Sequence, residues 1–360
     1  MLKKYGLYLA LILLTIVMIM DIKVNTPFTD FSKTWIAKPM KKEEGLTHYL
    51  DVAPNQKLYV EVLDSSLSIF SSPNQIVLET LSASVFENKI QINNDPNTHQ
   101  ITIKDGCSVN LYLPTNKEIE VISYNSNVST HKVFLSKLDL HNSSATLLDI
   151  NNQLEIFGDR SNIVVTNSSA LKITAQNCLI NLDQNKNISL DLASSTINAK
   201  EISSFDGLSI NSNLYLADVS FLSLNAKNGI LYLEKIQKEL DLDLTDIQGY
   251  LDLYSPRINK SKLTSNNCKL TIRLPENSNN MLMIETEETE INTNFDSKNR
   301  MTPNILSEQI RYVIKSQGGK IDLYRSLSIS IVLLSFTDLN PYKTENSKSI
   351  FEMLFEFLFI

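Results

Sequence analysis

Apolar side chains recur through the middle of the chain at a spacing of about 17 residues. In one series each apolar residue is followed two positions later by another, and the pairs are Ile163/Val165, Ile180/Leu182, Ile197/Ala199, Leu214/Leu216 and Leu231/Leu233. Successive side chains of a β-strand point to opposite faces, so each pair predicts a short strand with one buried face. A constant repeat of this length is typical of a solenoid, in which each repeat forms one coil.

A second apolar series lies halfway between the members of the first. Its pairs are Leu154/Ile156, Leu171/Ile173, Ile188/Leu190 and Leu222/Leu224, with Leu138/Leu140 before them and Leu240/Leu242 after them. One coil has Phe205 in strict register but Leu208 and Ile210 just past it, and we expect a bulge or a longer corner to absorb this slip. Each coil therefore contributes two short strands.

Polar clusters separate the predicted strands, namely Asn167-Ser168-Ser169, Asp183-Gln184-Asn185 and Ala193-Ser194-Ser195. Asn and Asp tolerate the left-handed backbone that a tight corner needs, so they can replace Gly, which occurs only 9 times. A helical repeat would place apolar residues three and four apart and would disfavour these clusters. We therefore predict an all-β fold, a β-helix-like β-solenoid whose narrow interior is filled by its own side chains and has no room for a cofactor.

The N-terminus carries a membrane segment. Lys3 and Lys4 precede an apolar run from Tyr5 to Met20, which Asp21 ends. This length suits either a short transmembrane helix or the core of a signal peptide. The flank lacks the pair of small residues that a cleavage site needs, which favours an uncleaved signal-anchor. Lysines before the segment predict a single-pass protein of the cell membrane with the bulk of the chain extracytoplasmic.

We expect five segments along the chain. They are a membrane anchor or signal segment at 1–21, a stalk or linker at 22–45, the solenoid domain at 46–300, terminal strands at 301–345 and an apolar C-terminal helix at 346–360. Ser347 or Ser349 is positioned to cap that helix, whose surface is apolar apart from Glu352 and Glu356. The helix must be buried, either against the last coil or against a membrane or another chain.

Composition and the absence of known motifs in the sequence argue against several classes of function and site. The net charge is −7, and Lys and Arg are scattered, so nucleic acid is not an expected partner. The 3 cysteines lie far apart and predict small buried residues, with neither a zinc site nor a disulfide scaffold. The 4 histidines stand outside any metal or hydrolase motif, and we expect each to be an exposed or hydrogen-bonded residue at a strand end. No metal, cofactor or catalytic residue is predicted.

A polysaccharide lyase built on a β-helix is the enzymatic alternative. It would need clustered carboxylates for calcium and a basic residue on one outer face. The predicted outer face of the second series carries Asp139, Glu155, Lys172, Ser189, Ser223 and Asp241. These charges alternate too much for a calcium cluster, so we do not expect an enzyme.

The outer face of the first series carries a polar and aromatic stripe. It begins at Val164, continues through Asn181, Asn198, Tyr215 and Tyr232, and is extended by Asp252. Stacked Asn and Tyr side chains form a candidate surface for contacting a sugar or a peptide. The alternative is that they only support neighbouring coils, as cross-strand pairs do.

Several features together resemble a bacterial family of β-strand-repeat proteins, the putative-adhesin family. They are the strands from Leu46 onward, the Leu111-Tyr112-Leu113-Pro114 step, the Asn/Ser-punctuated repeats and the Arg273-Leu274-Pro275 step. The resemblance spans 46–295 and implies a membrane-anchored protein without catalytic residues. The chain departs from that family in using Asn and Ser where Gly is usual.

The expected function is a structural or binding role, in adhesion or as an accessory of the cell envelope. The expected partners are the membrane, through Tyr5 to Met20, and a surface ligand or envelope protein. A self-assembling scaffold is the second hypothesis, because solenoid ends can stack into filaments, and the lyase is the third.

Overall fold

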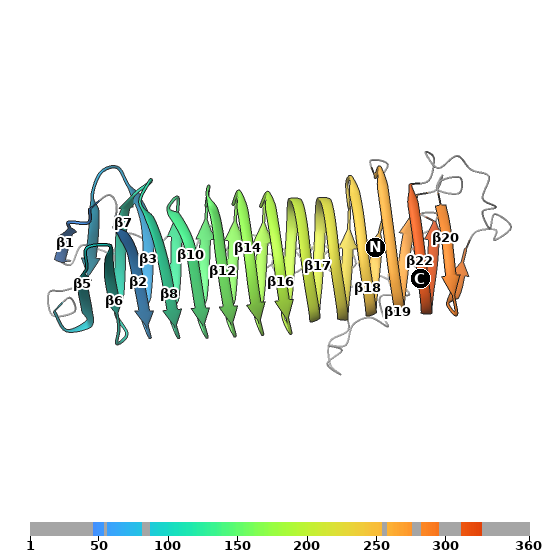
Figure 1. The fold of residues 1–360 in the computed structure, drawn as a ribbon, viewed down its shortest axis with the longest axis horizontal. Helices are drawn as coiled ribbons and strands as arrows, with labels where there is room; N and C mark the ends of the chain where they lie inside the picture. The colour runs from blue at the N-terminus through green and yellow to red at the C-terminus, as the bar shows by residue number, and fades with distance from the viewer. Residues whose placement is uncertain are drawn as a thin grey trace, which may run out of the picture.

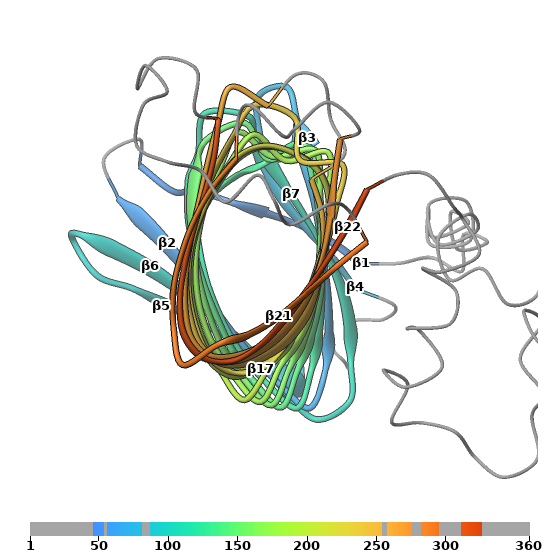
Figure 2. The same cartoon turned by 90° about the vertical axis from the view of Figure 1, so that its right-hand side faces the viewer.

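The computed structural model describes residues 46–53, 56–80, 87–253, 258–275, 282–294 and 311–325. Within these ranges the strands form one 22-stranded sheet. Figure 1 shows the sheet wound into an elongated rod, and Figure 2 shows its flattened cross-section with two long sides. The prediction of an all-β, solenoid-like architecture is therefore confirmed.

The strands are short except where consecutive strands and their corners run on without a break. Their bounds are β1 (Leu46–Leu50), β2 (Lys57–Leu63), β3 (Ser66–Ser72), β4 (Ile76–Thr80), β5 (Ile90–Asn94), β6 (Thr98–Ile103), β7 (Ser108–Pro114), β8 (Glu118–Tyr124), β9 (Asn127–His131), β10 (Phe134–His141), β11 (Ser144–Leu148), β12 (Gln153–Asp159), β13 (Asn162–Thr166), β14 (Ala170–Gln176), β15 (Leu179–Asp183), β16 (Asn187–Ala193), β17 (Thr196–Glu234), β18 (Glu239–Asp252), β19 (Lys260–Leu274), β20 (Leu282–Glu287), β21 (Glu290–Thr293) and β22 (Tyr312–Arg325).

Two columns of parallel strands make up the two long sides of the rod. The five-residue strands β11, β13 and β15 stack on one side, and the seven-residue strands β12, β14 and β16 stack on the other. We call these the short-strand face and the long-strand face. The first predicted series is confirmed on the short-strand face, where Ile163 lies opposite Ile180 and Ile180 opposite Ile197. These side chains are fully buried and fill the interior.

One coil is a residue longer than the predicted repeat. Leu138 lies opposite Ile156, not Leu154, and Leu140 lies opposite Gly158. We call the corner that follows each strand of the long-strand face the first corner. The residues with positive φ at the first corners on either side of this coil are Asn142 and Arg160, so the extra residue falls between them. As a consequence Lys137 faces Glu155, whereas Asp139 moves to the next outward column and faces Phe157. The predicted outer face was wrong at this one position.

The expected slip after Phe205 does not occur. Phe205 lies opposite Ile188, and the inward position two residues later is Gly207, which lies opposite Leu190. A β-carbon on Gly207 would stand 3.1 Å from the Phe205 ring, so the large ring occupies the space that this glycine leaves empty. Leu208 and Ile210 point outward, where they are 41 % and 40 % exposed.

The corners use left-handed residues that are mostly not glycine. One ladder of positive φ angles begins at Asn125, Asn142, Arg160 and Asn177, and a second runs through Asp149, Asn167 and Gln184. Asn and Asp adopt this region at lower cost than other side chains. The predicted corners at Asn167, Gln184 and Ser194 are confirmed, which explains how the chain turns with so few glycines.

A buried hydroxyl or thiol follows the left-handed residue at the first corner of most coils. The members of this corner ladder are Ser65, Ser126, Ser143, Ser161, Cys178, Ser195 and Ser212. Each backbone N–H donates to the side-chain oxygen or sulfur of the next member, at 2.9–3.4 Å. Each side chain in turn donates to the carbonyl two residues before it. All three cysteines are free and buried, as predicted, and Cys178 is one of these members.

Both ends of the rod break the sequence order of the coils. At the N-terminal end β2 lies between β6 and β8, and β3 lies between β7 and β9. At the other end β22 lies between β19 and the pair β20 and β21, as the colours in Figure 1 show. Antiparallel strands cover the N-terminal end, because β4 pairs with β7, β1 with β4 and β5 with β6.

Several predictions fall outside the described residues. These are the membrane segment at 1–21, the linker at 22–45, the apolar helix at 346–360 and, of the terminal strands at 301–345, all but residues 311–325. Across the ranges that the structure does describe, no helix has the length and apolar character needed to cross a membrane. The two Leu-Pro steps lie at strand ends, since β7 ends at Pro114 and β19 at Leu274.

Candidate functional site

The structure brings the predicted stripe together in one outward column of the short-strand face. Asn181 and Asn198 lie opposite each other, and the Asn198 amide nitrogen donates to Asn181 Oδ1 at 2.9 Å. The rings of Tyr215 and Tyr232 follow, with centroids 6.5 Å apart. The two asparagines therefore contact each other along the rod axis, and the two tyrosines lie side by side.

The column continues through a tyrosine that the constant spacing missed. Tyr250 lies opposite Tyr232, and their rings stack with centroids 5.3 Å apart. Asp252, the predicted extension of the stripe, instead lies one outward position further along β18 than Tyr250. The first-corner residues Asn228 and Asp246 are one residue further apart than the usual repeat, which moves the register. We call Asn181, Asn198, Tyr215, Tyr232 and Tyr250 the outer stripe.

Exposure decreases steeply along the three tyrosines. Tyr215 is 39 % exposed, Tyr232 is half-buried and Tyr250 is only 4 % exposed. Burial raises the pKa of Tyr250 to about 12, with a smaller contribution from Asp252, and burial also raises the pKa of Tyr232. Both hydroxyls therefore stay protonated at neutral pH and keep their ability to donate a hydrogen bond.

An ion pair lies next to Tyr250, at the buried end of the stripe. Arg273 Nη1 lies 3.4 Å from Asp252 Oδ2, and both side chains are largely buried. The Arg273 guanidinium also hydrogen-bonds the Tyr250 hydroxyl, which opposes the rise in the pKa of Tyr250. Tyr250 is thus fixed by its neighbours, whereas Tyr215, in the middle of the stripe, offers its ring to solvent. The outer stripe thus has a buried end at Tyr250 and an accessible end, formed by Asn181, Asn198 and Tyr215.

The long-strand face carries alternating charges along its rod axis. Lys172 Nζ lies 3.1 Å from Glu155 Oε1, and Lys262 Nζ lies 3.2 Å from Asp241 Oδ1. Across the described ranges no group of three or more His, Cys, Asp or Glu side chains is placed to hold a metal ion. Nothing in this part of the chain therefore provides the calcium cluster that the lyase hypothesis requires.

Two of the histidines pair with an aspartate near the surface, and a third is buried. His131 Nε2 lies 3.2 Å from Asp149, and His141 Nε2 lies 3.1 Å from Asp139. His99 departs from the prediction, because it points into the interior opposite Leu58 and is 4 % exposed. Neither of its ring nitrogens has a hydrogen-bond partner among the described residues. Burial, and then the charge of Lys117, lower the pKa of His99.

Comparisons with known proteins find similar solved structures but no matching family. No protein-family profile matches the chain, and no curated protein matches it. A putative cell adhesion protein from Clostridium sporogenes ATCC 15579 is similar over 79 % of this chain and 100 % of its own, at 11 % identity and a TM-score of 0.17. A putative adhesin from Bacteroides fragilis NCTC 9343 is similar over 78 % of this chain and 98 % of its own, at 11 % identity and a TM-score of 0.23. Superpositions this poor carry no argument about the site.

Proposed function

We propose that this protein is a non-catalytic β-solenoid of the bacterial cell envelope, with a role in adhesion or as an accessory binding component. In this proposal the segment from Tyr5 to Met20 anchors the chain in the membrane, and the solenoid lies outside the cytoplasm. The observation that carries the proposal is the filled interior. Because the inward Leu, Ile and Val side chains are fully buried against one another, recognition has to use the outer faces.

The accessible end of the outer stripe is the proposed contact surface. Tyr215 exposes an aromatic ring, and Asn181 and Asn198 offer amide groups in the same column. An aromatic ring beside amides suits a ligand with both an apolar face and hydrogen-bonding groups. Tyr250 and Arg273, at the buried end, hold the column in place and do not contact the ligand in this proposal.

Photo-crosslinking in intact cells tests this surface. A benzophenone amino acid replaces Tyr215 in the full-length protein, and in a matched control it replaces Tyr124, which is 38 % exposed and lies outside the stripe. We expect a discrete adduct from position 215 and none from position 124. Equal adducts at both positions, or no adduct at either, would contradict a contact role for the stripe.

A further inference from the structure

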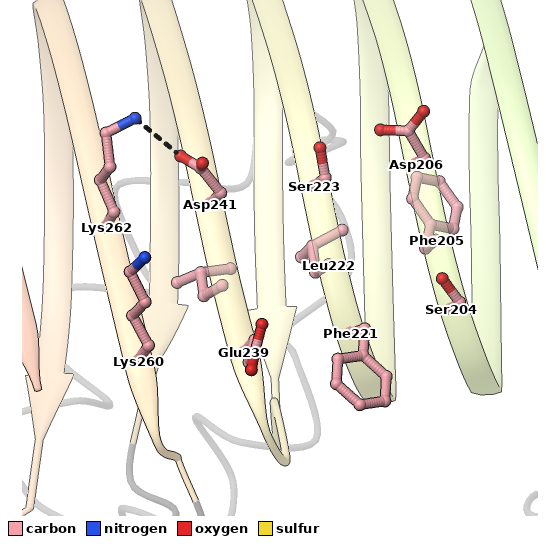
Figure 3. A pocket seen from close by; sticks show the side chains of 11 residues that line it. Ser204, Phe205, Asp206, Phe221, Leu222, Ser223, Glu239, Asp241, Lys260 and Lys262 are labelled. Atoms are coloured by element: carbon pink, nitrogen blue, oxygen red, sulfur yellow. Dashed lines mark hydrogen bonds and ion pairs between the residues drawn. The ribbon is translucent and has the colours of Figure 1, made fainter.

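A shallow groove of about 190 Å³ lies on the long-strand face, away from the outer stripe. Its lining residues come from neighbouring segments of β17, β18 and β19 (Figure 3). Its outward side chains form two columns along the rod axis. One column runs through Ser204, Phe221, Glu239 and Lys260, and the other through Asp206, Ser223, Asp241 and Lys262.

The hollow arises from side-chain size. Ser204 is the small neighbour of Phe221 in the same column, and Ser223 is the next outward residue along the strand of Phe221, so the surface is lowered next to an exposed aromatic ring. Phe221 is 40 % exposed, and Lys238 Nζ lies 5.0 Å from its ring centroid. Removing exposed apolar area of this kind from water contributes favourably to the free energy of binding a ligand.

Several polar groups around Phe221 have no ion pair or side-chain hydrogen bond among the described residues. Asp241 is paired with Lys262, but Asp206, Glu239 and Lys260 make no ion pair or side-chain hydrogen bond in the part of the chain that the structure describes. The groove therefore offers two free carboxylates as acceptors, one free ammonium group as a donor and two serine hydroxyls. All of them surround a single aromatic ring.

These features select one class of ligand. The backbone groups of β18 are already paired on both sides, with β17 and with β19, so a peptide cannot add as a strand here. The free carboxylates repel an anionic polymer. A neutral sugar has a C–H face that stacks on an aromatic ring and hydroxyls that both donate and accept hydrogen bonds.

We infer that this groove binds a neutral saccharide, with Phe221 as the stacking platform. Asp206 and Glu239 accept hydrogen bonds from sugar hydroxyls, and such bonds to a charged acceptor are among the stronger ones. Lys260, next to Glu239 in the same column, donates to the sugar. This site is on the other long side of the rod from the outer stripe, so it does not depend on the contact role proposed there.

A glycan array tests the inference. Full-length protein is kept in a detergent without a sugar headgroup and applied to printed neutral and acidic glycans. We expect binding to neutral glycans, and we expect Phe221→Ala to weaken it by at least about tenfold. Phe157→Ala is the matched control, because Phe157 is also an outward ring with a lysine over it, Lys137 Nζ at 5.2 Å, but lies outside the groove.

A second variant separates binding from folding. Ser223→Tyr fills the hollow and leaves Phe221, Asp206 and Glu239 in place, and we expect it to abolish binding while circular dichroism and the thermal midpoint stay close to those of the wild type. The inference is overturned if the wild-type protein binds no neutral glycan or prefers acidic ones. It is also overturned if Phe221→Ala and Phe157→Ala bind equally well.

Discussion

At the scale of single residues, the corner ladder shows how a buried polar group is made tolerable. Ser143 Oγ accepts the Ser126 N–H at 3.1 Å and donates to the His141 carbonyl at 2.8 Å. Both hydrogen-bonding functions of the hydroxyl are used, so its burial costs little. Cys178 takes the same place in its coil, accepting from Ser161 N–H at 3.4 Å and donating to the Gln176 carbonyl. A thiol is a weaker hydrogen-bonding group of similar shape.

Removing a ladder hydroxyl leaves a buried N–H without its acceptor. We expect Ser143→Ala to lower the free energy of unfolding by about 1–3 kcal/mol. Cys178→Ser is the matched control, because it restores the oxygen that most members of the ladder carry, and it should cost less than about 1 kcal/mol. Urea denaturation followed by circular dichroism measures both. Equal losses in the two variants would show that the ladder hydrogen bonds do not matter.

The buried His99 predicts a pH dependence of stability. Its pKa in the folded protein is lowered from 6.5, so an unfolded chain takes up the proton first as the pH falls. The contribution of His99 to stability is therefore complete above about pH 7 and decreases as the pH falls below 6.5 towards the lower folded value.

We expect His99→Leu to flatten the loss of thermal stability between pH 7 and about pH 5. His141→Gln serves as the control, since His141 is exposed beside Asp139 and should leave the slope attributable to His99 in place. Differential scanning calorimetry across this range gives the comparison. A His99→Leu protein with the wild-type pH slope would contradict the account.

At the scale of the coil, large and small inward side chains compensate for each other. Gly207 leaves room for the Phe205 ring, where other coils use two aliphatic residues of middle size. The sequence alone suggested a slip at this coil, because Leu208 and Ile210 look like core residues. Hydrogen-bonded register against β16 decides otherwise, and it places both side chains on the outside.

This compensation predicts that a second substitution can restore stability lost by the first. Gly207→Ala brings a β-carbon to 3.1 Å from the Phe205 ring and should destabilise the protein by about 1–3 kcal/mol. Combining it with Phe205→Leu should recover part of the loss, because the smaller side chain yields the space. Chemical denaturation of the two single variants and the double variant gives the coupling energy. Strictly additive losses would argue against shared packing.

The coils also show which features of the fold a 17-residue apolar repeat predicts and which it does not. The constant repeat predicted the strand pairs and most of the outer stripe, because coils of equal length stack in register. Two longer coils, before Arg160 and before Asp246, moved Asp139 out of one column and put Tyr250 into another. An extra residue in a corner leaves no apolar signature. The order of the end coils depends on pairing between distant segments, which a local pattern does not contain.

At the scale of the whole molecule, the two ends of the rod differ. Antiparallel strands β1, β4 and β5 cover the N-terminal end, so a second molecule cannot extend the parallel stack there. At the other end, β20 and β21 form the outermost coil of the part of the chain described, and four glutamates lie between Met283 and Ile291 (Glu285, Glu287, Glu288 and Glu290). Charged side chains on an edge oppose pairing with another chain.

We therefore do not expect head-to-tail filaments to form through the ends that the structure describes. We expect negative-stain electron microscopy of concentrated full-length protein in detergent to show separate rods of uniform length. Long unbranched filaments under the same conditions would support the self-assembling scaffold and count against a role as a separate binding component.

The most direct test of the central proposal is protease shaving of spheroplasts that make the full-length protein with a C-terminal epitope tag. We predict that the protein sediments with the membrane and that external protease removes the tag, while a cytoplasmic marker stays intact. Membrane-bound protein that is protected from protease would reverse the topology. Soluble protein in the periplasm or medium would mean that the segment from Tyr5 to Met20 is cleaved, and the membrane anchor would be wrong.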